Sequence, residues 1–444
     1  MRYGVAAAVL GLLASGAVRA DEPLTLGEAM ARARDGAREV AAATARQEAA
    51  SARARQASAF RLPSLTLSET YVRTSSPVDS FGLELNREEF TFQKFMATDP
   101  NDPGWSGTAI TRLEAQAPIF TGGELSGRIA QARSAAEAAG SQASWAADNA
   151  ALAAGEAWVM LAQAEEFVAL LTKARDTVAA HVALARSYVE QGMLVRSELL
   201  RAEVELARVE DLLEDAKGKA RVANANLAFR IGVPQDSTWT LAPLPGPGPL
   251  DGDASHWVSS ADSRKDLSAA RSLLRAGELE EKVKKAAWLP KVGVLARWDL
   301  HDKNLFGASG SAGTVMAFAS LNLFQGGADK AALVAAREEA RAGREDVARF
   351  ADGVALEVRQ AYEEAATARA RHATAVKALE AARESERITD ERFRSGVVKT
   401  IDLLDAATAR REAETRELVA RADAHATALR LAVKAGKAPE TAIP

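Results

Sequence analysis

The most regular pattern in the chain is a run of small and apolar residues at alternating steps of three and four. Its members are Ile129, Ala132, Ala136, Ala139, Ala143, Ala146, Ala150, Ala153, Ala157, Met160, Ala164, Phe167, Leu171, Ala174 and Val178. A period of about 3.5 residues predicts a helix that packs lengthwise against other helices, as in a coiled coil. A helix over about 123–190 would be on the order of 100 Å long, and no single compact core can bury such a rod.

A second long helix is predicted over about 197–230, and an equivalent pair over about 328–394 and 400–434, all rich in strong helix formers. Each pair reverses direction at a glycine, Gly192 or Gly396, which suits a helix end because glycine tolerates positive φ. These pairs are long-helix hairpins. A simple antiparallel coiled-coil hairpin is the alternative to packing of each helix against neighbours on both flanks.

Apolar residues follow both glycines, at the tips of the predicted hairpins. They are Met193, Leu194, Val397 and Val398. Exposed apolar residues at a tip are more easily understood as a docking surface than as core. Ser197 and Thr400 lie near the start of the returning helices, where their hydroxyls are suited to capping.

Four shorter segments alternate between apolar and polar residues with a period of two, which predicts β-strands. They lie at about 62–73, 108–120, 290–300 and 313–324. Strands of about ten residues with one apolar face fit a lipid-facing barrel with a wet lumen. Glu69 on the apolar face and Phe318 on the polar face depart from the pattern. A small amphipathic sheet that covers helices in a soluble protein therefore stays as an alternative.

Four strands cannot close a barrel by themselves. In lipid, an open sheet edge would leave backbone N–H and C=O groups unpaired. If the strands span a membrane, several chains must therefore share one barrel, of about eight strands for two chains or twelve for three. The hydrogen-bond requirement predicts oligomerisation but leaves the number of chains open.

The chain repeats itself at an offset of 204 residues, the separation between Phe120 and Phe324. The segments that lead from strand to helix share this offset: Phe120, Gly122 and Gly123 return as Phe324, Gly326 and Gly327. Upstream the offset is 227, the separation between Pro63 and Pro290, so the first copy holds 23 extra residues. These fall in its strand connection, roughly 74–105, which we predict to be a surface loop. The duplicated unit is thus helix, β-hairpin and long-helix hairpin.

The repeat divides the chain into successive regions. We expect a signal peptide at 1–20, a first repeat at 21–232, a Pro- and Gly-rich linker at 233–255, a second repeat at 256–434 and a flexible tail at 435–444. The signal peptide predicts export, and a soluble periplasmic or secreted protein remains an alternative. After residue 20 no run of about 18 apolar residues occurs, so no transmembrane helix is predicted.

Composition narrows the function classes. The formal net charge is −4, which argues against a nucleic-acid partner, and with no cysteine the chain forms no disulfide. The five histidines show no metal-ligand spacing, and no phosphate-binding loop or nucleophile motif occurs. We expect no catalytic residue, metal or cofactor, and hence no enzyme.

These features together resemble the outer-membrane efflux factors of the TolC type over nearly the whole mature sequence. The resemblance rests on the duplicated unit, on the two strand-to-helix segments and on the tips, with 393–406 the most specific match. It implies a mainly α fold with a small β part, in which a trimer forms an α-barrel tunnel joined to a shared transmembrane barrel of twelve strands. It also implies a location in the outer membrane of a Gram-negative bacterium, with a long periplasmic extension and contact with outer-membrane lipid. The linker would lie in the belt around the tunnel.

The resemblance also implies roles for residues at the tips. Asp402 and Asp405 stand where the family has acids lining the periplasmic entrance, and Glu198 is the matching acid of the first tip. Phe393 and Lys399 depart from the Tyr and Arg that hold the family's entrance closed. From the sequence alone, such a pair of acids is usually a solvated helix face.

The tips would contact a periplasmic adaptor protein that links the channel to an inner-membrane pump. The implied adaptor-contacting residues are Gly192, Met193, Leu194, Gly396, Val397 and Val398. The implied function is an exit duct of a tripartite efflux or type I secretion system, gated at the helix tips. The alternative is a soluble periplasmic coiled-coil scaffold or adaptor, although adaptors have a single helical hairpin within β-rich flanks.

Overall fold

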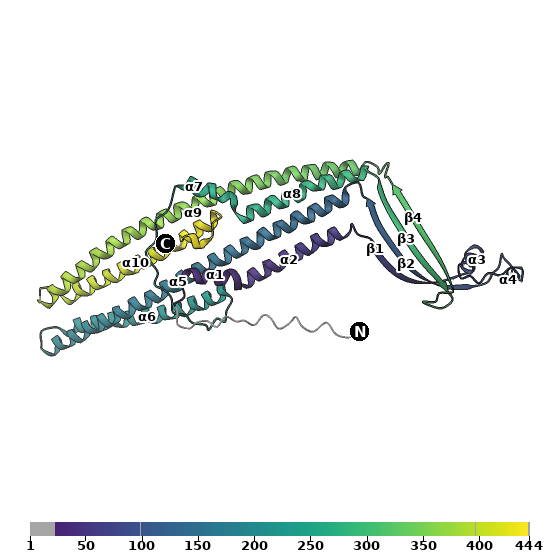
Figure 1. The fold of residues 1–444 in the computed structure, drawn as a ribbon. Helices are drawn as coiled ribbons and strands as arrows, with labels where there is room; N and C mark the ends of the chain where they lie inside the picture. The colour runs from purple at the N-terminus through teal and green to yellow at the C-terminus, as the bar shows by residue number, and fades with distance from the viewer. Residues whose placement is uncertain (1–22, 98, 396, 443–444) are drawn as a thin grey trace. The chain divides into compact units, whose positions relative to one another are not determined.

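The computed structural model describes residues 23–97, 99–395 and 397–442, and the predicted signal peptide therefore lies outside the described residues. The fold is mainly α with one small sheet (Figure 1). The helices are α1 Leu26–Gly36, α2 Arg38–Ala59, α3 Pro77–Asn86, α4 Phe92–Ala97, α5 Glu124–Glu190, α6 Arg196–Ile231, α7 Ala254–Ser260, α8 Lys265–Lys285, α9 Ala328–Arg394 and α10 Thr400–Lys434. The strands are β1 Ser64–Thr74, β2 Ser106–Phe120, β3 Lys291–Asp302 and β4 Gly310–Ser320. Three short 3-10 helices are Ala261–Ser263, Ala286–Trp288 and Pro439–Ala442.

The chain forms two compact units that cut across the two sequence repeats. The first contains the residues up to Ala42, Ser144–Arg264 and those from Asp352 onward, whereas the second contains Ala43–Ala143 and Lys265–Ala351. Each unit takes part of both copies, because the long helices α5 and α9 each contribute to both units.

The first unit has its main core where α1 packs among α5, α6 and α10. The core is built around Met30, Trp158, Leu161, Leu227 and Leu429. The indole N–H of Trp158 donates to the backbone oxygen of Leu24 at 2.9 Å, so the buried ring has its polar partner. At Gly155 an added Cβ would lie 3.0 Å from the sulfur of Met30, so the small residue permits close packing of α5.

The predicted seam between α5 and α6 is buried along part of its length. Two clusters join the helices, one around Leu171 and Leu213 and one around Val178 and Val209. Met160 belongs to the same predicted run but is exposed. A 3.5-residue period therefore identified the contact face of the hairpin, but not which of its positions a neighbour covers.

The second unit contains the sheet, in which four antiparallel strands follow the order β1-β2-β3-β4. The register aligns Leu67 with Leu113, Leu113 with Trp298 and Trp298 with Gly313. Residues opposite each other in antiparallel strands point to the same side. The predicted apolar sets thus share one face, called here the apolar face, and Arg112 and Asp299 belong to the other, polar face.

The two residues that departed from the alternation are both accommodated. The carboxylate of Glu69 accepts hydrogen bonds from the Thr111 hydroxyl and, at 3.1 Å, from the Phe306 backbone N–H. The ring of Phe318 lies over Gly293, which it faces across the ladder and where an added Cβ would collide with it. A polar group on the apolar face is satisfied, and an apolar ring on the polar face fills space left by glycine.

Several predicted boundaries differ from the structure. The fourth strand ends at Ser320, so Phe324 lies beyond the sheet rather than within it. The predicted surface loop at 74–105 contains helices α3 and α4. Part of the tail forms the 3-10 helix Pro439–Ala442, where Glu440 pairs with Arg34 at 3.1 Å. Its residues 443–444 lie outside the described part.

Within residues 23–97, 99–395 and 397–442, no helix combines the length and the apolar character needed to cross a membrane.

Candidate functional site

The first hairpin tip presents apolar side chains between α5 and α6. Gly192 has a φ of 73°, the left-handed conformation that glycine adopts without strain. Met193 and Val195 beside it are exposed, and Leu194 is half-buried. Val195 is the N-cap of α6 and makes no side-chain capping bond. The prediction that Ser197 caps this helix was wrong, because the helix begins one residue earlier.

The second tip has a different cap. Gly396 lies outside the described residues, Val397 is exposed and Val398 is half-buried. The N-cap of α10 is Lys399, whose backbone N–H donates to the carboxylate of Asp402 at 3.0 Å. Thr400 was predicted to cap the helix but is its first residue, and its hydroxyl is buried without a hydrogen-bond partner among the described atoms.

The acids predicted to line the entrance lie on exposed surface. Asp402 and Asp405 are exposed, whereas Leu403 and Leu404 between them are buried and anchor the start of α10. Glu198 on the first tip is half-buried and accepts a hydrogen bond from Arg201 at 3.4 Å. The two tips therefore differ in charge: the second has carboxylates on an exposed face, and the first has a carboxylate paired with an arginine.

A set of ion pairs that the sequence analysis missed joins α10 to its neighbours. Arg411 donates through both terminal nitrogens to Glu205 of α6 at 3.0 Å, and the two side chains are only 11% and 16% exposed. Arg410 pairs with Glu386 of α9 at 2.9 Å. Burial raises the pKa of Glu386, which Arg410 opposes. No local pattern could identify such pairs, because the Arg411 and Glu205 positions are 206 residues apart.

Further from the tips, α10 also pairs with α5 and α9. Arg421 binds Glu166 of α5 and approaches Glu417 at 3.3 Å. Glu417 in turn accepts from His372 of α9 at 3.1 Å. Together with Arg411 and Arg410, these contacts tie one helix to three others, so a rearrangement of α10 must break several partly buried charge pairs.

The linker between the repeats is held by basic side chains of α9 and α10. Arg369 donates to the Gly248 oxygen at 2.8 Å, and His425 contacts the Pro245 oxygen at 2.8 Å through Nε2. A carbonyl only accepts, so Nε2 of His425 carries the hydrogen. Burial lowers the pKa of His425, partly offset by the Pro245 carbonyl and reinforced by Arg421.

The strand-to-helix segments have the same backbone but different surroundings. Phe120 ends β2, and Gly122 and Gly123 follow with φ of 64° and 90°. Gly326 and Gly327 have φ of 62° and 83°, after Phe324. An added Cβ at Gly122 would lie 2.8 Å from the Leu289 Cβ, whereas none of the described atoms lies within 4 Å of one at Gly326.

The polar face of the sheet carries its own charge pair. Arg112 of β2 binds Asp299 of β3 through two nitrogens at 2.7 and 3.0 Å. Arg297 lies 3.7 Å from the same carboxylate. This bidentate geometry is the strong form of an Arg–carboxylate contact. Within the described residues no group of three or more His, Cys, Asp or Glu side chains could hold a metal ion.

A family of known proteins and one curated relative match this chain in sequence. The model of the family described as "Outer membrane efflux protein" matches residues 29–233 and 258–437. Protein CyaE of Bordetella pertussis is 28% identical over 283 residues, which are 61% of this chain and 58% of that protein. The chain thus matches little more than half the length of this curated relative.

Solved structures share the fold. The outer membrane protein VceC of Vibrio cholerae matches with a TM-score of 0.74 and 19% identity, covering 93% of this chain and 96% of that one. The open state of the Neisseria gonorrhoeae MtrE outer membrane channel matches with a TM-score of 0.76 and 18% identity, covering 93% and 89%. Since the family model covers most of the sequence in two blocks, one in each copy, the chain belongs to the outer membrane efflux protein family.

Proposed function

We propose that this outer membrane efflux protein is the exit duct of a tripartite efflux or type I secretion system, passing substrates through periplasm and outer membrane. The observation that carries the proposal is the continuous apolar face of the sheet. Leu65 and Leu67 of β1, Trp298 of β3 and Val315 of β4 all have exposed side chains on it. A wide exposed apolar face needs a non-aqueous neighbour, and lipid of the outer membrane supplies one.

The oligomer follows from the edges of the sheet. β1 and β4 are its edge strands, so each offers one side of unpaired backbone groups. In lipid these groups must be paired, which neighbouring copies of the sheet can do. Family resemblance selects three copies, giving a shared barrel of about twelve strands continued by an α-helical tunnel in the periplasm.

An apolar groove in the first unit favours the same conclusion. It has a volume of about 1050 Å³ and runs along α5, α6 and α10. Met160, Phe167, Val222, Leu418 and Val419 line it. In a tunnel built from three chains, helices of the adjacent copy would cover such a groove.

The gate is proposed at the second tip. Asp402 and Asp405 of three copies would form a ring of six carboxylates, which attracts cations and repels anions. Glu198 would add to it less, because Arg201 neutralises it. Asp402 has a second task, since it caps α10. The contacts of Arg411 and Arg410 would hold α10 in the closed arrangement, in place of the Tyr and Arg of the family pattern.

The partners are proposed from the tips and from the chemistry of the chain. Exposed Met193 and Val397, with their neighbours, would contact a periplasmic adaptor that connects to an inner-membrane pump. The family is one of efflux proteins, and we propose that this chain has no catalytic activity, so the pump supplies the energy. The family match does not favour the alternative of a soluble scaffold or adaptor.

Purified protein in planar bilayers tests the proposal. We expect a sodium-carbonate wash of membranes to leave the protein in the pellet. After solubilisation in detergent, the protein should be a trimer that forms channels of small conductance. Asp402→Asn with Asp405→Asn should reduce cation selectivity and raise conductance, whereas Glu198→Gln, the matched change at the first tip, should alter both less. A carbonate-soluble monomer without channel activity would contradict the duct. Channels whose ion selectivity is unchanged by the double substitution would contradict only the gate.

A further inference from the structure

The β1–β2 connection packs against the end of the sheet that is farther from the long helices. It leaves the sheet at the strand ends opposite those joined to α2, α5 and α9 (Figure 1). Gly310, which begins β4, lies opposite His301 of β3. An added Cβ at Gly310 would collide with the backbone oxygen of Asn86 and would lie 2.9 Å from the Arg87 carbonyl carbon. Gly310, His301 and Asp299 share the polar face, so the end of α3 covers the end of that face at Gly310.

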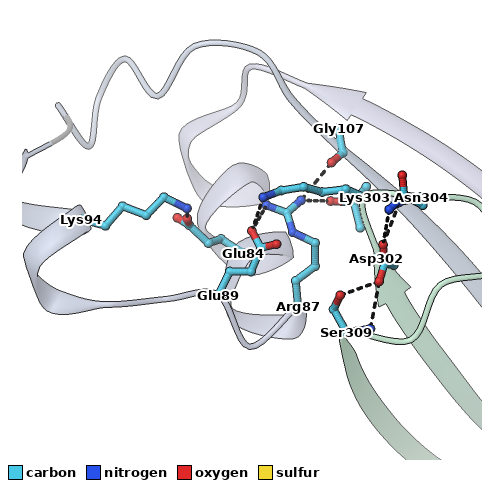
Figure 2. Close-up of polar contacts among 10 residues, drawn as sticks. Glu84, Arg87, Glu89, Lys94, Gly107, Asp302, Lys303, Asn304 and Ser309 are labelled. Carbon is cyan, nitrogen blue, oxygen red and sulfur yellow. Dashed lines mark hydrogen bonds and ion pairs between the residues drawn. The ribbon is translucent and has the colours of Figure 1, made fainter.

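Arg87 fixes this arrangement. Its side chain is only 3% exposed and donates to the Gly107 backbone oxygen at 2.9 Å and to the Thr108 hydroxyl (Figure 2). Thr108 is fully buried and belongs to the polar face of β2. A buried guanidinium must be hydrogen-bonded, and the two hydrogen bonds of Arg87 are to strand β2. Arg87 therefore attaches the connection to the sheet.

Glu89 joins the two connections at this end of the sheet. Its carboxylate lies 3.4 Å from Arg87 and 2.8 Å from Lys303, which follows β3 (Figure 2). The short turn after β3 is itself ordered, since Asp302 accepts from the backbone N–H groups of Asn304 at 2.8 Å and Ser309 at 3.1 Å. The longer connection thus pairs with a turn that has its own hydrogen bonds.

The connection also has an internal core. Phe81 of α3 packs against Phe90 and Phe95, with ring centroids 5.4 and 5.7 Å apart, and Lys94 of α4 pairs with Glu84 of α3. Aromatic pairs at these separations are stabilising. The segment is therefore a small folded element and not a loose loop.

We propose that residues 75–97 form a lid over the outer end of the pore, held closed by Arg87 and Glu89. The inference rests on the proposed function, in which the polar face lines the pore and this end faces the exterior. Three lids in a trimer would narrow the outer mouth of the pore. The duct would then have two constrictions, the lids and the gate at the helix tips, each with its own charge pairs.

Thiol labelling of intact cells tests the lid, and the cysteine-free chain allows single cysteines to be read without background. His301→Cys reports on the polar face beneath the lid, where the native side chain is buried. Val78→Cys, at an 80% exposed position on α3, reports on the outer surface. A bulky, membrane-impermeant maleimide should label Val78→Cys rapidly and His301→Cys slowly.

Substitutions that loosen the lid should change the labelling rate of His301→Cys but not that of Val78→Cys. Adding Arg87→Ala should raise labelling of His301→Cys about tenfold, as expected for losing a buried charged hydrogen bond. Glu89→Gln should raise it less, because Arg87 stays. Lys94→Ala is the matched control, since that cation pairs within the connection and should leave the rate unchanged.

The outcomes separate the lid from the duct. If Val78→Cys is not labelled on intact cells, this end does not face outward, and the proposed function fails in that respect. If Val78→Cys is labelled but His301→Cys reacts at the same rate with and without Arg87→Ala, the lid is wrong while the duct stands. An equal increase with Lys94→Ala would also overturn the role of Arg87, because it would indicate general loosening.

Discussion

The two copies of the repeat share a backbone plan but differ in what surrounds it. The strand connection of the first copy holds α3 and α4, whereas that of the second is the short turn from Lys303 to Ser309. The turn at Gly122 is packed against Leu289, and its counterpart at Gly326 is open. The duplication therefore conserves local conformation, while packing makes each copy distinct.

The ion pairs also differ between the two copies. Arg411 of the second copy pairs with Glu205 of the first, and the residues 204 positions away from them are Ala207 and Ala409. The pair therefore exists once, between the copies, and not twice. The duplication gave two helical hairpins that then diverged. The second copy now has the arginine of the pair, and the first copy has the glutamate.

The largest expected effect comes from Gly122, the first of the two strand-to-helix turns. Gly122→Ala combines positive φ with contacts at 2.8 and 2.9 Å to the Leu289 Cβ and the Ala286 oxygen, so we expect a loss of about 3 kcal/mol. Gly326→Ala meets only the φ penalty, about 1 kcal/mol. Thermal unfolding of the detergent-solubilised protein measures both. Equal losses would mean that packing around the first turn contributes nothing.

The inter-copy ion pair should give the next largest effect. Arg411→Gln leaves partly buried Glu205 with only the more distant and exposed Arg208, at 3.8 Å, so we expect destabilisation of roughly 2 kcal/mol and more frequent channel opening. Arg416→Gln is the matched control, because that arginine is exposed and pairs at 3.2 Å with Glu412 on its own helix. Single-channel recordings check the prediction. Identical opening by the two variants would remove Arg411 from the closed state.

The linker contact predicts a pH dependence that the corresponding position of the first copy does not share. Burial lowers the pKa of His425 below its ordinary value of 6.5, so the unfolded chain binds a proton more readily than the folded one. Stability should therefore fall as pH decreases through 6.5, and it should stop falling below the folded-state pKa. His425→Gln keeps a donor but cannot titrate, and should reduce this slope in unfolding measured between about pH 5 and pH 8; half-buried His181, whose pKa is also lowered by burial, should keep its own share. Arg221, at the corresponding position of the first copy, is exposed.

The smallest effect concerns a strain that both strand connections share. Glu88 in the first has a φ of 58° and Phe306 in the second a φ of 59°, values that cost a residue with a Cβ about 1 kcal/mol. Glu88→Gly and Phe306→Gly should each raise stability by about 0.5 kcal/mol, after the added flexibility of the unfolded chain. Thermal unfolding again measures the change. A loss in either variant would show that its side chain contributes more than the backbone strain costs.

Local periodicity explains which parts of the fold were predictable. The long helices and the two faces of each strand follow from spacings of about 3.5 and two residues, which depend on neighbours in sequence. The exposed acids Asp402 and Asp405 were found through resemblance, not through periodicity. The cap of α10 was missed, because Asp402 accepts from Lys399 only when the helix begins at Thr400, and element boundaries depend on the whole tip.

By itself, the sequence determined the duplication, the rod-like helices and the alternating strands, since each is a repeated local preference. The tertiary structure alone decided that the compact units cut across the copies, that Arg411 meets Glu205 and that Arg87 attaches α3 to the sheet. These contacts join residues that are distant in sequence. A buried charge needs a partner, and only the folded chain decides which group lies within reach of it. Hydrophobic spacing predicts which face is covered, but only packing decides what covers it.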